Sequence, residues 1–208
     1  MPEALVVAGI GAQVVLLRSA ALGRIPFWPT ISVTFAALGS ATLVVGSVSW
    51  CSKIGAPAAL GVGVGSGLLL YAATRVVVEV ATRMPTIEAS VAGVYGWSQG
   101  VPRVAMWGLT LVLVVPGEEL FWRGLVLPEL QGATSVVAGS VLTWAGAAGV
   151  AAAWTSAPFL AAAVVGGAVW TTLGAWSGGV LAPIASHLLW TGLMLAWPPR
   201  AGRGKVRP

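Results

Sequence analysis

Long apolar runs separated by short polar stretches dominate the pattern of this sequence. Seven runs approach or exceed the length, about 20 residues, that an α-helix needs to cross a bilayer. They fall at residues 4–22, 27–49, 55–81, 103–127, 134–154, 157–175 and 180–198. The pattern predicts an all-α fold: a polytopic membrane helical bundle with about seven transmembrane helices. Eight is the alternative count, because the run at 55–81 is long.

The composition agrees with a membrane protein and not with a soluble domain. Of the 208 residues, 57% are hydrophobic and only 8% are charged, whereas about a quarter of a soluble domain is charged. The single cysteine, Cys51, cannot form an internal disulfide or a cysteine-based metal cluster. The net charge of +5 does not indicate nucleic-acid binding, since the basic residues are scattered at segment ends. The lipid bilayer is therefore the expected partner.

The basic residues also predict an orientation. If the tail at 199–208 is cytoplasmic, eight basic residues lie on that side, at Arg18, Arg24, Arg83, Arg103 and four tail positions, and only Lys53 lies opposite. Such an asymmetry is typical of cytoplasmic loops. The predicted localisation is thus integral membrane and multi-pass, with a cytoplasmic C-terminal tail. The same segments place Glu118 and His187 toward the non-cytoplasmic side.

Two other features concern the packing of the bundle. The polar stretch at 82–102, with Tyr95 and Trp97, predicts an interfacial turn or a short helix on the membrane surface. Glycines recur at four-residue spacing in "GVGVGSG" and again at Gly174 and Gly178. Small residues at this spacing allow helices to pack closely in lipid, so we expect tight contacts within one bundle.

Ionisable residues inside the apolar runs are few, and an unpaired charge in hydrocarbon costs roughly several kcal/mol. Arg75 and Glu79 are four residues apart, so they can pair on one helix face. A structural ion pair near a helix end is the favoured interpretation. Outside that pair, the remaining ionisable groups in the apolar runs gather in "VVPGEELFWRG" and at the only histidine, His187.

The spacing within "VVPGEELFWRG" predicts a second ion pair, between Glu119 and Arg123. Glu118 would then lie about 100° round the helix and would be a candidate general base or acid. A purely structural Arg–Glu clamp between helices is the alternative, and the spacing alone favours neither. A water-filled pocket between two helices would allow His187, which shares its helix face with Thr191, to meet Glu118.

Three stretches resemble the CPBP intramembrane endopeptidases, a family that includes the type II CAAX prenyl endopeptidases and bacterial bacteriocin-processing and immunity proteins. "EELFWRG" resembles the family's Glu-Glu-x-x-x-Arg motif, and "LAPIASHLLWT" resembles its last, histidine-containing motif. "GSVLTWAGAAG" stands where the family has a helix reading Phe-x-x-x-His. The resemblance covers the core at 103–198, which we expect to be CPBP-like. From the apolar and charged patterns we expect N-terminal transmembrane helices with an interfacial loop before it (1–102) and a basic tail after it (199–208).

The resemblance implies cleavage of a hydrophobic or membrane-associated peptide, or of a membrane protein, inside the bilayer. It implies that Glu118 activates water and that Glu119 and Arg123 support it. His187 would polarise the scissile carbonyl or help to bind a metal.

The sequence departs from the family pattern in the other motif positions. Trp144 aligns with the phenylalanine, Ala148 with the histidine of the middle motif, and Thr191 with a common asparagine. Trp144 and Thr191 remain candidate substrate-binding or support residues. A catalytic zinc usually has three protein ligands, so zinc, which the family implies, would need both glutamates beside His187. Because Arg123 competes for one of them, we do not expect zinc, and the cofactor stays open.

These observations leave three functions to compare. The first is an intramembrane endopeptidase that uses Glu118 as base. The second, favoured by Ala148, is a catalytically inactive relative that acts as a partner-binding, immunity or scaffold protein. The third is a small transporter or channel subunit with a Glu118–His187 proton relay, although the sequence has no repeat pair or broken-helix pattern. The sequence does not specify the substrate or the oligomeric state.

Overall fold

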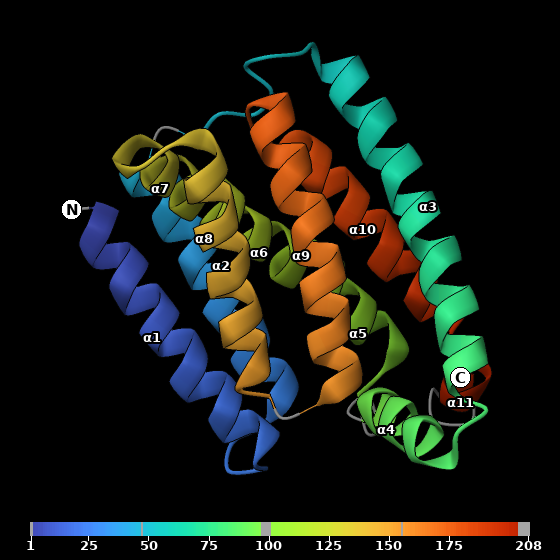
Figure 1. Cartoon of the computed structure of the whole chain (residues 1–208). Helices are drawn as coiled ribbons and strands as arrows, with labels where there is room; N and C mark the ends of the chain where they lie inside the picture. The colour runs from blue at the N-terminus through green and yellow to red at the C-terminus, as the bar shows by residue number, and fades with distance from the viewer. Residues whose placement is uncertain (1, 47, 97–100, 155, 204–208) are drawn as a thin grey trace.

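A computed structural model describes residues 2–46, 48–96, 101–154 and 156–203. Every regular element in this part of the chain is helical, so the predicted all-α bundle is confirmed (Figure 1). Trp97, which belongs to the predicted interfacial stretch at 82–102, and residues 204–208 of the predicted tail lie outside the described residues.

The helices follow the seven predicted runs closely. They are α1 (Pro2–Ala21), α2 (Phe27–Val45), α3 (Ala56–Ala81), α4 (Pro85–Gly96), α5 (Arg103–Gly108), η1 (Leu109–Val114), α6 (Val115–Phe121), η2 (Trp122–Val126), α7 (Leu127–Ala133), α8 (Val136–Ala152), α9 (Ala157–Ser177), α10 (Leu181–Ala196) and α11 (Arg200–Arg203). Five stretches are long and apolar enough to span a membrane, namely α1, α2, α3, α9 and the joined helices from Arg103 to Ala133. Helices α8 and α10 are apolar but shorter. The chain is therefore an integral membrane protein.

One boundary differs from the sequence prediction in a way that matters for the site. The predicted run at 103–127 continues as helix to Ala133, which gives a stretch of 31 residues. Thr134 then ends the helix, and Ser135 caps α8 by accepting a hydrogen bond from the amide of Ala138 at 3.1 Å. Glu118 consequently lies at the middle of its stretch and not near the non-cytoplasmic end, as the shorter run had suggested.

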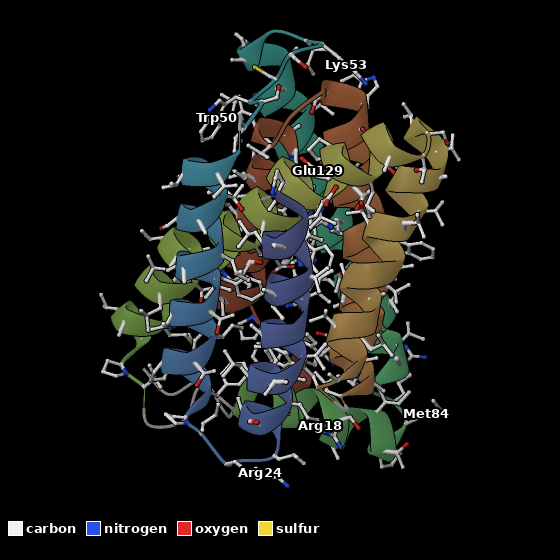
Figure 2. All side chains as sticks on the ribbon, turned by 90° about the vertical axis from the view of Figure 1, so that its left-hand side faces the viewer. Arg18, Arg24, Trp50, Lys53, Met84 and Glu129 are labelled. Carbon is white, nitrogen blue, oxygen red and sulfur yellow. The ribbon has the colours of Figure 1, made fainter. Side chains whose placement is uncertain are left out.

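The two ends of the bundle carry different charges. Arg18, Arg24 and Met84 lie at one end, and Trp50, Lys53 and Glu129 lie toward the other (Figure 2). At the first end, Arg18 reaches from α1 to the carbonyl of Ala153 at 3.3 Å. This end is called the basic end below.

Helix α3 has two pairs of glycines at four-residue spacing, Gly61–Gly65 and Gly63–Gly67, and only the second pair lies against another helix. An added Cβ at Gly63 would lie 2.6 Å from the carbonyl oxygen of Ala182, and one at Gly67 would lie 2.7 Å from that of Ser186. Gly61 and Gly65 have nothing within 4 Å. Helix α3 therefore packs on α10 through Gly63 and Gly67, and α10 is its main partner.

The C-terminal segment is fixed to α3 by the predicted ion pair. Arg75 contacts Glu79 at 3.0 Å, and it also donates to the carbonyl of Pro198 at 2.9 Å. Glu79 accepts from the backbone amide of Arg200 at 3.2 Å. The predicted short helix at 82–102 is α4, and burial raises the pKa of its Tyr95 well above the ordinary value.

The helix that carries the glutamates is irregular on both sides of them. The π-helical segments η1 and η2 flank α6, and such segments are frequent at functional sites. Pro116 begins α6, and Gly117 lies so close to Phe35 of α2 that a Cβ there would overlap its carbonyl oxygen. Gly117 thus serves close packing of α6 on α2, which holds the following residue, Glu118, in place.

Candidate functional site

Glu119 is the centre of a buried polar network. Its Oε1 accepts from Arg123 Nη1 at 3.2 Å, as the spacing predicted, and lies 2.7 Å from Nδ1 of His187. Arg123 also donates to the carbonyl of Gly167 at 3.2 Å and to the hydroxyl of Thr171 at 3.3 Å. The network therefore ties three helical segments, α6–η2, α9 and α10, to one carboxylate oxygen.

The partner of His187 differs from the prediction. We expected His187 to meet Glu118, but the hydrogen bond goes to Glu119. Successive residues on a helix are about 100° apart, so the two carboxylates approach His187 from different directions. Only Glu119 is hydrogen-bonded to it, although the ligand atoms of all three residues lie within 4.8 Å of one another. Because an ionised carboxylate can only accept, Nδ1 of His187 carries the proton in this contact.

Glu118 faces a cavity instead. The cavity has about 60 Å³ of room for the centres of water molecules, and one water needs roughly 10–15 Å³ by that measure. It can therefore hold a few waters beside the Glu118 carboxylate. Besides Glu118, its wall consists of Gln13, Leu17, Ile31, Phe35, Trp122, Arg123, Ala147, Val150, Ala151, Trp154, Phe159, Ala163, Gly167 and Trp170.

The cavity runs from the middle of the bundle toward the basic end. Leu17 and Trp154 form part of its wall, and they adjoin Arg18 and Ala153, which are hydrogen-bonded at that end. Glu118 marks the other limit, at the middle of its helix. The cavity wall thus extends from Glu118 toward the side where the arginines lie.

Trp170 joins the network to the cavity. Its ring stacks on His187 with the centroids 3.5 Å apart and the planes at 15°, and the guanidinium carbon of Arg123 lies 5.8 Å from its centroid. Trp170 forms part of the cavity wall, whereas His187 is not among the wall residues. His187 therefore stacks on the Trp170 ring and is held in one orientation by Glu119, while one of its ring nitrogens lies within 4.8 Å of a ligand atom on Glu118.

Glu118, Glu119 and His187 also form a set that a divalent metal would fit. Each offers one ligand atom, and these atoms lie within 4.8 Å of one another. Three protein ligands are usual for a catalytic zinc. Arg123 and His187 both contact Oε1 of Glu119, and Oε2 is buried with no hydrogen-bond partner among the described residues. Arg123 thus competes with a cation for Oε1 of Glu119, as we expected, but it leaves Oε2 available to bind one.

The other residues named from the sequence lie away from the cavity wall. The indole of Trp144 donates to the carbonyl of Val164 at 2.8 Å, which links α8 to α9. The hydroxyl of Thr191 is buried without a partner in the described part of the chain. Helix α8 presents Ala147, Val150 and Ala151 to the cavity, so Ala148 is not on its cavity-facing side. The roles of Trp144 and Thr191 stay predictions.

Two wall residues, Gln13 and Trp170, were missed by the sequence analysis. Gln13 on α1 is fully buried, donates to the carbonyl of Gly9 at 3.2 Å and accepts from the Trp122 indole at 3.3 Å. An amide in the middle of an apolar run was a usable signal, because such residues are rare in spanning helices. Trp170 gave no signal, since tryptophan is frequent throughout this chain.

The comparisons with known proteins agree with this core. No curated protein and no solved structure matches the chain. The family model described as type II CAAX prenyl endopeptidase Rce1-like matches residues 100–193, which covers α5 to most of α10 and includes both glutamates, Arg123 and His187. The match is close to the core predicted at 103–198, and it indicates a function of the intramembrane CAAX protease type. Residues 100–193 of this chain are therefore similar to the Rce1-like type II CAAX prenyl endopeptidases, which supports the CPBP family of intramembrane CAAX proteases for this core.

Proposed function

We propose that this protein is an intramembrane endopeptidase that cleaves a hydrophobic or membrane-associated peptide with a water activated by Glu118. The observation that carries the proposal is the position of Glu118. It borders a cavity with room for water and lies within 4.8 Å of ligand atoms on Glu119 and His187. A carboxylate beside a cavity with room for water, with a supporting charged network behind it, is suited to general base catalysis.

In the proposed reaction Glu118 transfers the proton and His187 acts on the carbonyl of the scissile bond. Glu118 takes a proton from water, and the water oxygen bonds to the scissile carbonyl carbon while the π electrons move to the carbonyl oxygen. His187, a ligand atom of which lies within 4.8 Å of one on Glu118, polarises that carbonyl. The carbonyl then re-forms as the C–N bond breaks, and the proton held by Glu118 passes to the leaving nitrogen, which leaves a carboxylic acid and an amine as products.

Glu119 and Arg123 support this chemistry without taking part in proton transfer. Arg123 neutralises Glu119, and Glu119 fixes the ring of His187 through Nδ1. A second residue that orients a histidine in this way is common in hydrolytic sites. A zinc ion, when bound, would be held by Glu118, Glu119 and His187 and would supply Lewis-acid polarisation of a carbonyl.

The proposed orientation places the basic end in the cytoplasm. The arginines at that end support it, since cytoplasmic loops of membrane proteins carry an excess of lysine and arginine. The peptide would then enter the cavity from the cytoplasmic side, past Leu17 and Trp154. Labelling of single cysteines at Arg24 and Lys53 with a membrane-impermeant reagent in intact cells, in a Cys51→Ser background, tests this. We expect labelling at position 53 and not at 24, and the reverse pattern would contradict the orientation.

The activity is tested with purified protein in liposomes. The substrates are a peptide that ends in a farnesylated Cys-a-a-X sequence and an unprenylated apolar peptide of the same length. We expect the wild type to cleave at least one of them and Glu118→Gln to be slower by about 10²–10⁴-fold, the usual contribution of a general base. Glu129→Gln, on the same helical stretch but at its far end, is the matched control and should cleave normally. Equal rates for the wild type and Glu118→Gln would refute the proposal.

The inactive relative remains the second candidate, and one observation favours it. The α8 side of the cavity is apolar, since it consists of Ala147, Val150 and Ala151, and Ala148 stands at the position that the resemblance aligns with a histidine. In that case the cavity would bind a hydrophobic peptide or membrane protein without cutting it. A partner that copurifies equally with the wild type and Glu118→Gln, while the cleavage assay stays negative for both, would favour this candidate.

A further inference from the structure

The accessible part of the cavity wall belongs to few residues. Most of the wall residues are buried, but Glu118, Ala147, Phe159 and Ala163 are half-buried. These four are therefore the wall side chains that retain surface for a bound molecule to touch. Two of them are alanines, so small apolar groups border the space near the proposed base.

Ala163 lies between the basic end and the charged network. Helix α9 presents Phe159, Ala163 and Gly167 to the cavity, and their four-residue spacing puts them on one face of the helix. The carbonyl of Gly167 accepts from Arg123 at 3.2 Å, so Ala163 is one helical turn from that contact. A peptide that enters from the basic end would therefore meet Ala163 before it reaches the level of Arg123.

Ala147 lies on the neighbouring helix at a similar depth. The indole of Trp144 on α8 donates to the carbonyl of Val164 on α9 at 2.8 Å, which fixes the register of these two antiparallel helices (Figure 1). Ala147 is three residues from Trp144 and Ala163 is one residue from Val164, both in the direction of the basic end. The two alanines therefore lie within about one turn of each other along the helix axes. They are called the alanine pair below.

The room beside the alanine pair is limited. The cavity has about 60 Å³ of room for the centres of water molecules, which corresponds to roughly four to six waters. A similar number of non-hydrogen atoms would fill it, so a scissile peptide unit leaves space for a short side chain and not for an aromatic ring. Protein interiors are close-packed, and a change of one methylene group in the wall is felt. The size of the two alanines therefore sets how large a neighbouring side chain of the substrate can be.

We propose that Ala147 and Ala163 form a subsite that admits only a small aliphatic side chain on a residue flanking the scissile bond. This inference rests on the proposed function and narrows the class of substrate for that site. The substrate is an apolar peptide with a residue such as alanine or valine, and not phenylalanine, at the point of cleavage. Substitutions in the alanine pair should therefore change which side chains are accepted, and not only the overall rate.

Three apolar peptides of equal length test the subsite, with two alanines, two valines or two phenylalanines at the centre. Cleavage at the central pair is followed by mass spectrometry with the protein in liposomes. We expect the wild type to have a kcat/KM at least about tenfold higher for the valine than for the phenylalanine peptide. Ala163→Gly should reduce that ratio by at least about fourfold, the factor for one methyl group. Ala163→Val and Ala147→Val should each reduce the ratio of the valine to the alanine peptide by a similar factor.

Ala161 provides the matched control. It lies on α9 two residues before Ala163, about 200° round the helix, and it is exposed and not among the wall residues. Ala161→Gly and Ala161→Val carry the same change in helix propensity and should leave both ratios within about twofold of the wild type. Because each ratio is measured within one variant, a loss of folded protein cancels. Ratios that the Ala163 variants leave unchanged, or that the Ala161 variants change equally, would overturn the assignment.

Failure of the subsite is distinguishable from failure of the proposed function. If the wild type cleaves and Glu118→Gln does not, but the Ala163 variants keep the wild-type ratios, only the subsite is wrong. If the wild type is no faster than Glu118→Gln on all three peptides, the proposed function is wrong, and equilibrium binding of the same peptides to Glu118→Gln in micelles then decides. Binding of the valine peptide at least about tenfold more tightly than the phenylalanine peptide, reduced by Ala163→Gly, would support the subsite, and equal binding would overturn it.

Discussion

The buried pair of Glu119 and Arg123 makes a quantitative test possible, because the chain holds a second pair with the same residue types and spacing. The Glu119–Arg123 contact is 3.2 Å long, with side chains 0% and 1% exposed. The Arg75–Glu79 contact is 3.0 Å long, with side chains 20% and 28% exposed. The two pairs therefore differ mainly in their access to solvent, which is the variable that sets the strength of an ion pair.

The expected magnitudes follow from that difference. At an effective dielectric constant of about 20, two unit charges separated by the 3.2 Å of the buried pair attract by about 5 kcal/mol. Removing one partner of a buried pair typically costs about 3–5 kcal/mol, because the other charge is left uncompensated. Ion pairs that water can reach contribute only about 0–1 kcal/mol, and we expect the partly exposed Arg75–Glu79 pair, near the end of α3, to fall in that range.

Two double-mutant cycles measure these values. The first combines Arg123→Met with Glu119→Gln, and the second combines Arg75→Met with Glu79→Gln, each followed by denaturant unfolding of the protein in micelles. We expect Arg123→Met alone to lower the free energy of unfolding by about 3–5 kcal/mol. Adding Glu119→Gln should restore part of the loss, which gives a coupling energy of at least about 2 kcal/mol. The exposed pair should show a coupling energy below about 1 kcal/mol.

A coupling energy for Glu119 and Arg123 no larger than that of Arg75 and Glu79 would refute the reasoning. It would mean that the core around Glu119 is wet enough to screen the charges. A double variant that is less stable than Arg123→Met alone would also contradict it, since removing the stranded carboxylate would then bring no relief.

Two further predictions concern packing and helix capping. Gly63→Ala should lower the free energy of unfolding by about 1–3 kcal/mol, because the new Cβ would lie 2.6 Å from the carbonyl oxygen of Ala182. Gly61→Ala, which meets nothing within 4 Å, should leave it unchanged or raise it by up to about 1 kcal/mol, and similar losses for both variants would contradict the assigned α3–α10 contact. Ser135→Ala should cost about 1 kcal/mol by removing the cap on the amide of Ala138; an unchanged free energy of unfolding would show that the cap contributes nothing.

The fold was predictable because the bilayer imposes one simple rule. Each apolar run of sufficient length had to become a helix, and all seven did. The end of the fourth run was harder to predict, since "PELQGA" is polar enough to resemble a loop, yet residues 127–133 continue the helix to Ala133. That extension moved Glu118 from near one end of its helix to the middle.

The site was predictable only where the spacing within one helix determines a contact. The four-residue spacing of Glu119 and Arg123 fixed their pairing. The partner of His187 depends on how α10 is rotated against α6, which a local pattern does not contain. Trp170 was missed for the same reason: nothing in its neighbours along the chain distinguishes an indole that faces lipid from one that closes a cavity.

The contact between Glu119 and His187 has a consequence for the order in which the protein is made. His187 lies on α10, the last long helix of this sequence, and α3 has α10 as its main partner. During synthesis the first six long segments enter the membrane while α3 lacks that partner and Glu119 has only Arg123 beside it. Completion of α10 supplies both contacts together, so the nascent chain cannot assemble the site before α10 has left the ribosome.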